Sequence, residues 1–419
     1  MKNYFYLYTF FVLIISNNLF AQEIEEITVI GSYIGSKSDK ISVEVIDETE
    51  FNNLNISTVG EISKYLASSA GSHFQSNTLD GVDQGMSAIT LRGLDHASTL
   101  VLLNKKRQTF AGTPSHEGEG YIDVNIIPEI ALRRTEILKE GATSLYGSDA
   151  VAGVINFITH DEFTGTRIKL GHQETTGYDQ SDKTIGIIFG KEFNNANLVL
   201  AANFLDRSPL SSSEIPKIAE NGLSTLGNTF KVSEADSVLS GDYAGEYTAG
   251  QWVPDPNCEI NGGVLAGPFC KFLYGTRFNI VNDEDHKKFY LSFKKDNDNL
   301  SYKLTAIVAN IDVNDNPQSP SYPALSFMSK KIMPGQGGSP FNVPVTWYGR
   351  PLGSAFPSPL SPKDIDQYHV SGLVNLSLNE NIDLELSITQ SKHENFHNRP
   401  DTINSRMENA ISGNGGSNG

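Results

Sequence analysis

The chain has 419 residues, more than one ordinary domain requires, so we expect at least two structural units. Its 32 Lys and Arg residues against 49 Asp and Glu give a formal net charge of −17, which argues against a nucleic-acid or anionic-membrane-surface partner. A mean hydropathy of −0.27 excludes a protein built from many membrane-spanning helices, but it leaves membrane-crossing strands possible.

The N-terminus has the features of a secretory signal peptide over residues 1–21. Lys2 provides a positive charge, residues 4–15 form a short apolar run, and Ala21 provides a small residue at a cleavage site. The alternative is a membrane anchor, but the apolar run is too short to cross a bilayer as a helix. We therefore expect an exported chain that is cleaved near Ala21.

Cys258 and Cys270 are the only cysteines in the sequence. In an exported chain their spacing suits a small disulfide in a loop, and the alternative is two free thiols. Two cysteines without neighbouring histidines make a poor metal site. We therefore predict no metal and no cofactor.

Residues 22–40 mix a few β-branched residues with acidic and small ones, so this segment cannot form a core by itself. From residue 41 to about 163 the pattern is that of a compact mixed α/β domain. Thr58 and Glu61 form a capping-box motif that predicts a helix over 59–70. The other elements expected here are strands at 89–94, 99–103, 136–139 and 154–158, a turn at Asn104 and Lys105, a helical turn after Pro128, and a short helix over 142–146.

From residue 164 to 419 the hydrophobic period changes to two residues, which predicts strands with one apolar and one polar face. On the clearest strand, Ile382, Leu384 and Leu386 alternate with Asp383 and Glu385. Seven such strands are readable. Their cores are residues 166–174, 185–189, 198–204, 289–293, 300–308, 370–378 and 382–396.

The connections between these strands alternate between short and long. Short turns at 194–196, 296–298 and 379–381 are separated by long links over about 208–285 and 314–363. A soluble β-sandwich would show the same alternation along its strands. Short turns on one side and long loops on the other are typical of a transmembrane barrel, which we favour.

Several motifs resemble those of TonB-dependent outer-membrane receptors, in the order found in that family. Residues 25–32, Glu-Glu-Ile-Thr-Val-Ile-Gly-Ser, resemble the TonB box, and the motifs that follow resemble those of the plug domain. The plug-like motifs are 91–94 (LRGL), 100–104 (LVLLN), 124–128 (VNIIP), 137–142 (ILKEGA), 144–150 (SLYGSDA) and 152–156 (AGVIN). The resemblance implies an α+β plug domain at 41–163 followed by antiparallel transmembrane β-barrel strands at 164–419.

The resemblance also implies energised import of a scarce nutrient, such as a ferric siderophore, cobalamin or an oligosaccharide. The TonB protein of the periplasm would be the energising partner, and the box could pair with it as an added strand. We expect a monomer, in contact with lipid, in the outer membrane of a Gram-negative bacterium. The residues expected to bind TonB are Glu26, Ile27, Thr28, Val29, Ile30 and Gly31.

Ligand contacts are expected from two outward-facing plug loops, at 72–85 and 109–120. The candidates are His73, Phe74, Gln75 and His116, against the alternative that they are ordinary loop residues. Charged plug residues could also pair with the barrel wall, and those considered are Arg92, Arg133, Arg134, Glu136, Lys139 and Glu140.

Two other classes of protein remain as alternatives. One is a surface-binding or adhesion protein without transport, and the other is a secreted enzyme with an α/β domain and a β-sandwich. No arrangement of Ser, His and Asp marks a catalytic triad, so we predict no catalytic residues and no enzyme. Seven strands are too few for a plugged barrel of about 22, so we expect a fragment or a truncated product.

Overall fold

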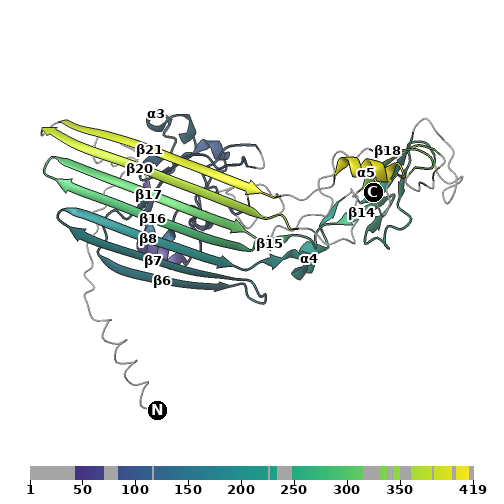
Figure 1. Cartoon of the computed structure of the whole chain (residues 1–419), viewed down its shortest axis with the longest axis horizontal. Helices are drawn as coiled ribbons and strands as arrows, with labels where there is room; N and C mark the ends of the chain where they lie inside the picture. Colours follow the sequence, from purple (N-terminus) through teal and green to yellow (C-terminus); the bar gives the residue numbers. More distant parts are fainter. Residues whose placement is uncertain are drawn as a thin grey trace, which may run out of the picture.

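The computed structural model describes residues 43–414, except for 70–83, 116–117, 225–226, 234–247, 315–329, 337–338, 340, 342, 350–359, 380–381 and 399–402. It contains a mixed α/β plug, a large tilted sheet, and a unit formed by the long loops beyond one end of that sheet (Figure 1). None of the helices in this part of the chain has the length and apolar character needed to cross a membrane.

The plug is built on a five-stranded sheet in the order β1-β4-β5-β2-β3. Strand β2 runs parallel to β5, and the other neighbours are antiparallel. Short helices contact the sheet. The elements are β1 (Val43–Asp47), α2 (Glu48–Leu54), η1 (Val59–Lys64), η2 (His96–Ser98), β2 (Thr99–Leu103), β3 (Lys106–Arg107), η3 (Glu129–Ala131), β4 (Leu132–Leu138), α3 (Thr143–Tyr146), η4 (Ser148–Ala150) and β5 (Gly153–Thr159).

Sequence pattern explains why β2 and β5 occupy the inner positions of this sheet. β2 (TLVLL) is buried along its whole length, and in β5 only Ile158 is partly exposed. Strands covered on both faces are nearly continuous apolar runs rather than alternating ones. Asn104 and Lys105 both have positive φ, 49° and 66°, so they form the tight turn that the sequence predicts between β2 and β3.

Two of the predicted plug elements are wrong. The helix expected over 59–70 is a short 3-10 helix, η1, because Thr58 makes no side-chain cap and Glu61 instead accepts the amide of Ser57 at 3.1 Å. No strand forms at 89–94. Arg92 and Gly93 have φ values of 59° and 68°, which turn the backbone where an extended strand would have to continue.

The seven predicted strands all form, and they make one antiparallel sheet in the order β21-β20-β17-β16-β8-β7-β6. Asn194 and Asn195, with φ values of 48° and 58°, make the two-residue turn between β7 and β8. The sheet is open, with β6 and β21 at its edges. Its strands are β6 (Gly165–Glu174), β7 (Ser181–Phe193), β8 (Ala196–Arg207), β16 (Glu284–Asn297), β17 (Leu300–Val313), β20 (Lys363–Asn379) and β21 (Ile382–His397).

The long links, together with the segment after β21, form a loop unit with a small core of its own, which includes Val232, Val253 and Phe341. Trp347 packs there against Met407 and Ile411 of the last helix. The elements of the loop unit are β9 (Leu210–Ser211), η5 (Ser212–Glu214), α4 (Pro216–Ala219), β10 (Leu223–Ser224), β11 (Asn228–Val232), β12 (Trp252–Pro254), β13 (Val264–Ala266), β14 (Phe269–Leu273), β15 (Asn279–Val281), β18 (Lys330–Ile332), β19 (Val345–Gly349) and α5 (Asn404–Ile411).

Candidate functional site: the plug–sheet interface and the loop unit

The two faces of the large sheet differ in chemistry, as the alternating pattern predicts. Along β16 the residues that face the plug are buried and mostly polar: Glu284, His286, Lys288, Tyr290 and Ser292. The residues between them face away from the plug, and Phe289 is 49% exposed there. The apolar core of the plug continues onto the inward face through Ile188, Val199 and Ile307. The plug therefore packs on the mixed, largely polar face and leaves an apolar face uncovered.

Buried polar contacts fix the plug to the middle of the sheet. The hydroxyl of Tyr290 donates to the backbone oxygen of His160 at 2.7 Å, and Lys288 pairs with Glu129 at 2.5 Å. The side-chain oxygen of Asn203 accepts the amide of Ile130 at 2.9 Å. Because a buried polar group costs free energy unless it is paired, these bonds specify one position of η3 on the sheet.

Arg207 is the centre of a buried ionic cluster at the loop end of the sheet. Its guanidinium donates to both oxygens of Asp182, at 3.0 and 2.6 Å, and reaches Glu284 at 3.4 Å. A third carboxylate, Glu61, lies 3.3 Å away and belongs to η1 of the plug. Arg207 is 4% exposed and the side chain of Glu61 is 13% exposed, so this cluster joins plug and sheet with little contact with water.

A second set of charges holds the segment between β5 and β6. Asp161 pairs with Lys303 at 2.8 Å, and Glu162 pairs with Lys294 at 2.5 Å. Burial raises the pKa of Asp161, but the nearby ammonium groups of Lys303 and Lys294 outweigh burial and hold that pKa below its usual value. The carboxylate therefore stays charged, and the plug remains tied to the sheet, at neutral pH.

His160, next to this segment, makes plug stability sensitive to acid. Burial, with a smaller contribution from the charge of Arg133, lowers the pKa of His160 to about 4. Oε2 of Glu48 lies 3.2 Å from Nε2 of His160, and the other oxygen of Glu48 pairs with Arg167; burial is still the largest cause of the lowered pKa of His160. Below pH 6.5 the unfolded chain takes up a proton that the folded plug does not, so stability falls until about pH 4.

For the His160→Gln variant we expect a smaller loss of stability on acidification from pH 7.5 to pH 5. The difference from the wild type should be roughly 2 kcal/mol, since the folded-state pKa lies well below that of the unfolded chain. Denaturant unfolding in detergent at both pH values measures it. His172→Gln, at an exposed site, is the matched control. An unchanged pH dependence in His160→Gln would contradict this assignment.

The plug also contacts the edge strand β21. The amide of Thr109 donates to Ser391 at 2.8 Å, and the amide of Gly112 donates to Nδ1 of His393 at 2.9 Å. Asp123 lies 3.4 Å from the other ring nitrogen of His393. The first part of the 109–120 loop therefore lies against the sheet.

The charges that join plug and sheet are not those considered from the sequence. Arg134 pairs with Glu136 inside the plug at 2.8 Å, and Lys139 pairs with Glu44 of β1 at 2.5 Å. Other charged residues, none of them considered for this role, make the contacts to the sheet instead. They are Glu48, Glu61, Lys106, Asp123, Glu129, Asp161 and Glu162.

The predicted binding residues lie outside the described part of the chain. This holds for the expected TonB box, residues 26–31, and for the ligand candidates His73, Phe74, Gln75 and His116. Among the described residues, no group of three or more His, Cys, Asp or Glu side chains is placed to hold a metal ion.

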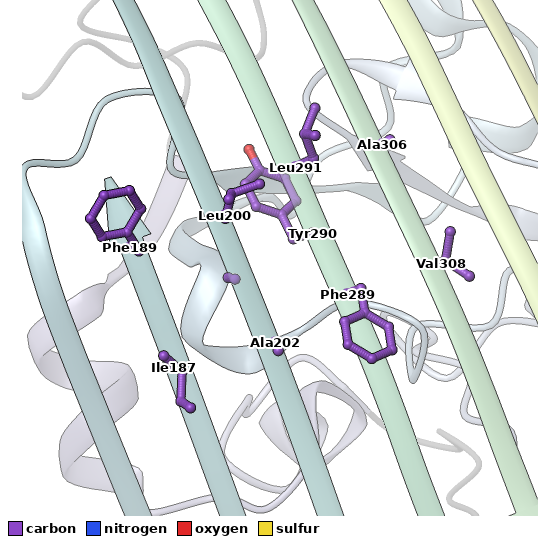
Figure 2. Close-up of a pocket in the computed structure, with 10 residues that line it drawn as sticks. Ile187, Phe189, Leu200, Ala202, Phe289, Tyr290, Leu291, Ala306 and Val308 are labelled. Atoms are coloured by element: carbon purple, nitrogen blue, oxygen red, sulfur yellow. The ribbon is translucent and has the colours of Figure 1, made fainter. Parts of the chain in front are cut away.

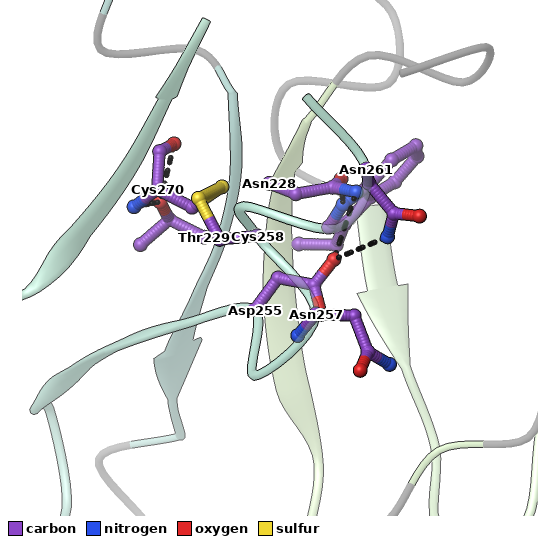
Figure 3. Close-up of a disulfide and its surroundings, with 8 residues drawn as sticks. Asn228, Thr229, Asp255, Asn257, Cys258, Asn261 and Cys270 are labelled. Atoms are coloured by element: carbon purple, nitrogen blue, oxygen red, sulfur yellow. Dashed lines mark hydrogen bonds between the residues drawn. A yellow bond between two sulfur atoms is a disulfide. The ribbon is translucent and has the colours of Figure 1, made fainter. Parts of the chain in front are cut away.

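Cys258 and Cys270 form a disulfide that ties β14 to the turn after β12 (Figure 3). The side chain of Asp255 organises this turn by accepting the amide of Asn257 at 2.9 Å and the side-chain nitrogen of Asn228 at 3.2 Å. A Cβ at Gly263 would lie 2.7 Å from both sulfur atoms, so only glycine fits there.

Aromatic side chains gather in the loop unit beside this disulfide. The ring of Trp252 lies 4.8 Å from that of Tyr348 and 5.5 Å from that of Phe269, between ring centres. All three side chains are partly exposed. The arrangement offers aromatic faces on which a planar or sugar-like ligand could stack.

Comparison with known proteins places the plug in a family. Residues 36–154 match the family model described as the TonB-dependent Receptor Plug Domain. Over 75 residues the chain is 40% identical to the iron-regulated outer membrane virulence protein of Vibrio cholerae serotype O1, a stretch that covers 18% of this chain and 12% of that protein.

One solved structure shares the fold, and a second aligns with a similar part of the chain. A variant of the ferric enterobactin receptor from Pseudomonas aeruginosa, in complex with enterobactin, aligns with a TM-score of 0.50 at 12% identity, over 84% of this chain and 41% of that one. The siderophore receptor from Acinetobacter baumannii aligns with a TM-score of 0.40 at 18% identity, over 84% of this chain and 48% of that one. The chain thus spans less than half the length of these receptors.

A plug packed on the inward face of an antiparallel sheet, with an apolar face on the other side, is the arrangement that the chain has in common with the fold of the enterobactin-bound receptor structure. The family match thus identifies residues 36–154 as a TonB-dependent receptor plug domain.

Proposed function

We propose that this protein is an outer-membrane receptor that imports a scarce nutrient with energy supplied through TonB. The observation that carries the proposal is the seating of a TonB-dependent receptor plug on the inward face of the sheet. The opposite face suits contact with lipid, because Ile187, Phe289 and Val308 expose apolar side chains there. Large exposed apolar surfaces are rare on soluble monomers.

We propose a ferric siderophore as the substrate class. The matched relative is named for its regulation by iron, and the receptor structures are named for siderophores. The aromatic cluster of Trp252, Tyr348 and Phe269 supports a ligand with planar groups. His73, Phe74, Gln75 and His116 stay as candidate contacts from the plug loops.

The partner and location follow from the same proposal. A segment of alternating Ile27, Thr28 and Val29 can pair edge to edge with a strand of periplasmic TonB, with Glu26, Ile30 and Gly31 at its ends. Residues 1–21 would direct export, and the sheet would lie in the outer membrane of a Gram-negative cell. In that orientation the tight turns face the periplasm and the loop unit faces outward. The proposal also includes the division of the chain into a signal peptide (1–21), a TonB box with its linker (22–40), a plug domain (41–163) and barrel strands (164–419).

A spin label on the apolar face tests the membrane placement. For the Leu200→Cys variant, labelled with the native disulfide left intact, we expect the label to be accessible to oxygen and shielded from a water-soluble nickel complex. Power saturation in reconstituted vesicles measures both accessibilities. A label at Ile260, 83% exposed in the loop unit, provides the matched control and should show the reverse. Strong relaxation by the nickel complex at position 200 would favour a soluble β-sandwich and overturn the proposal.

A further inference from the structure

The apolar face of the sheet carries a shallow groove of about 470 Å³ across β7, β8, β16 and β17. Figure 2 shows Ile187 and Phe189 on one side of it, Phe289 and Val308 toward the other, and Ala202 between them. Ala202 pairs with Ile187 and Phe289, and Ala306 lies next to Leu291 in the register. The groove forms because the small side chains of Ala202 and Ala306 lie directly beside larger side chains on the neighbouring strands.

Aromatic rings lie on the same face, nearer the tight turns. These rings are Phe193 on β7, Phe293 on β16 and Tyr302 on β17. The ring centre of Phe293 lies 6.4 Å from that of Phe193 and 6.1 Å from that of Tyr302. Aromatic girdles of this kind mark the level where hydrocarbon gives way to lipid headgroups.

Two lysines flank these rings. Lys191 is two residues from Phe193, and Lys295 is two residues from Phe293, so strand alternation puts both lysines on the apolar face. Within the part of the chain that the structure describes, neither lysine makes an ion pair.

The lysines at the loop end of the same face are different, because each has a carboxylate partner. Lys183 pairs with Asp206 at 4.0 Å, Lys287 with Asp312 at 3.2 Å, and Lys392 with Glu394 at 2.8 Å. The uncompensated positive charge is thus confined to the tight-turn end, where it is available to an anion from outside the protein.

We propose that this surface binds an anionic phospholipid of the leaflet on the tight-turn side. Its phosphate lies between Lys191 and Lys295, and one acyl chain runs along the groove past Phe189 and Ala306. The inference rests on the proposed function, because it requires the sheet to be in a membrane.

The dimensions fit one lipid. Lys295 lies two strands away from Lys191 and two residues further along the strand direction, so their Cα atoms are about 12 Å apart. Both ammonium groups can therefore reach one phosphate. From Leu198, beside Lys191, to Phe204, two residues beyond the groove residue Ala202, the strand rises about 20 Å. At a tilt of about 40° this rise spans about 15 Å of depth, half of a 30 Å hydrocarbon core.

Native mass spectrometry of the purified full chain, with equal amounts of dioleoyl phosphatidylglycerol and dioleoyl phosphatidylcholine, tests the proposal. We expect the wild type to retain phosphatidylglycerol about tenfold better, because two lysines contact its net negative charge. The variant K191Q/K295Q should retain the two lipids about equally. The matched control K183Q/K287Q, which removes paired lysines at the loop end, should keep the preference.

A third variant tests the seat of the acyl chain. Ala306→Phe fills the groove and should lower retention of both lipids while leaving the ratio between them nearly unchanged. Equal retention of the two lipids by the wild type, or an unchanged preference in K191Q/K295Q, would overturn the proposal. Cell fractionation separates this failure from failure of the proposed function, since only the latter predicts that the protein is missing from the outer-membrane fraction.

Discussion

Replacing Arg207 with methionine should destabilise the protein by about 3–5 kcal/mol, because it leaves buried carboxylates without their cation. Asp182 and Glu284 face the guanidinium from neighbouring strands, and Glu61 faces it from the plug. Methionine fills a similar volume, so the loss would come from charge rather than from a cavity. The destabilisation should appear first in the plug, whose helix η1 would lose its ionic contact with the sheet.

Denaturant unfolding in detergent measures the overall loss, and hydrogen exchange at residues 59–64 measures the local one. Lys183→Met is the matched control. Its ammonium lies 4.0 Å from Asp206 and both side chains are more than 60% exposed, so we expect a change below about 1 kcal/mol. If Arg207→Met cost no more than this control, the cluster would not hold plug and sheet together.

The large sheet could be predicted from sequence because one physical constraint acts along every strand. In β16, Phe289 and Leu291 face away from the plug, whereas Tyr290 and Ser292 face it. This difference appears in the sequence as an alternation with a period of two residues. The turn at Asn194 and Asn195 was readable because asparagine tolerates positive φ.

The plug was harder to predict where tertiary contacts override local preference. Glu61 has the spacing of a helix cap, but its carboxylate bonds to Ser57 and Arg207 instead of extending the helix. Leu91 lies in an apolar run, yet its amide bonds to the side chain of Thr99 and the chain turns at Arg92. For Glu61 the partner Arg207 lies 146 residues away, far outside the window that a local pattern covers, and for Leu91 the partner is a side chain rather than a neighbouring strand.

The candidate site was predictable only in part, because its contacts join distant parts of the chain. Trp252 and Tyr348 are adjacent only because β12 and β19 both pair with β11. One signal for the ionic cluster was present. Asp182, Arg207 and Glu284 come at the loop ends of three strands, and strand register alone would have aligned them. The contribution of Glu61 from the plug left no such signal.

Deleting residues 27–30 should abolish energised uptake while leaving ligand binding intact. The reason is mechanical, since added-strand pairing through backbone groups would be the route by which TonB pulls on the plug. Loss of the strand removes that connection but leaves the loop unit and the plug in place. The effect should therefore be close to complete in uptake and small in binding.

The direct test uses cells that express the receptor and the strain's own siderophores loaded with radioactive iron, with binding measured in the cold and uptake at growth temperature. Deletion of residues 36–39 shortens the same segment equally and serves as the matched control. The account predicts that deleting 27–30 leaves binding near the wild-type level and reduces uptake to that of energy-depleted cells, while the control still transports. Uptake that persists after deletion of 27–30 would contradict TonB-coupled import by this protein.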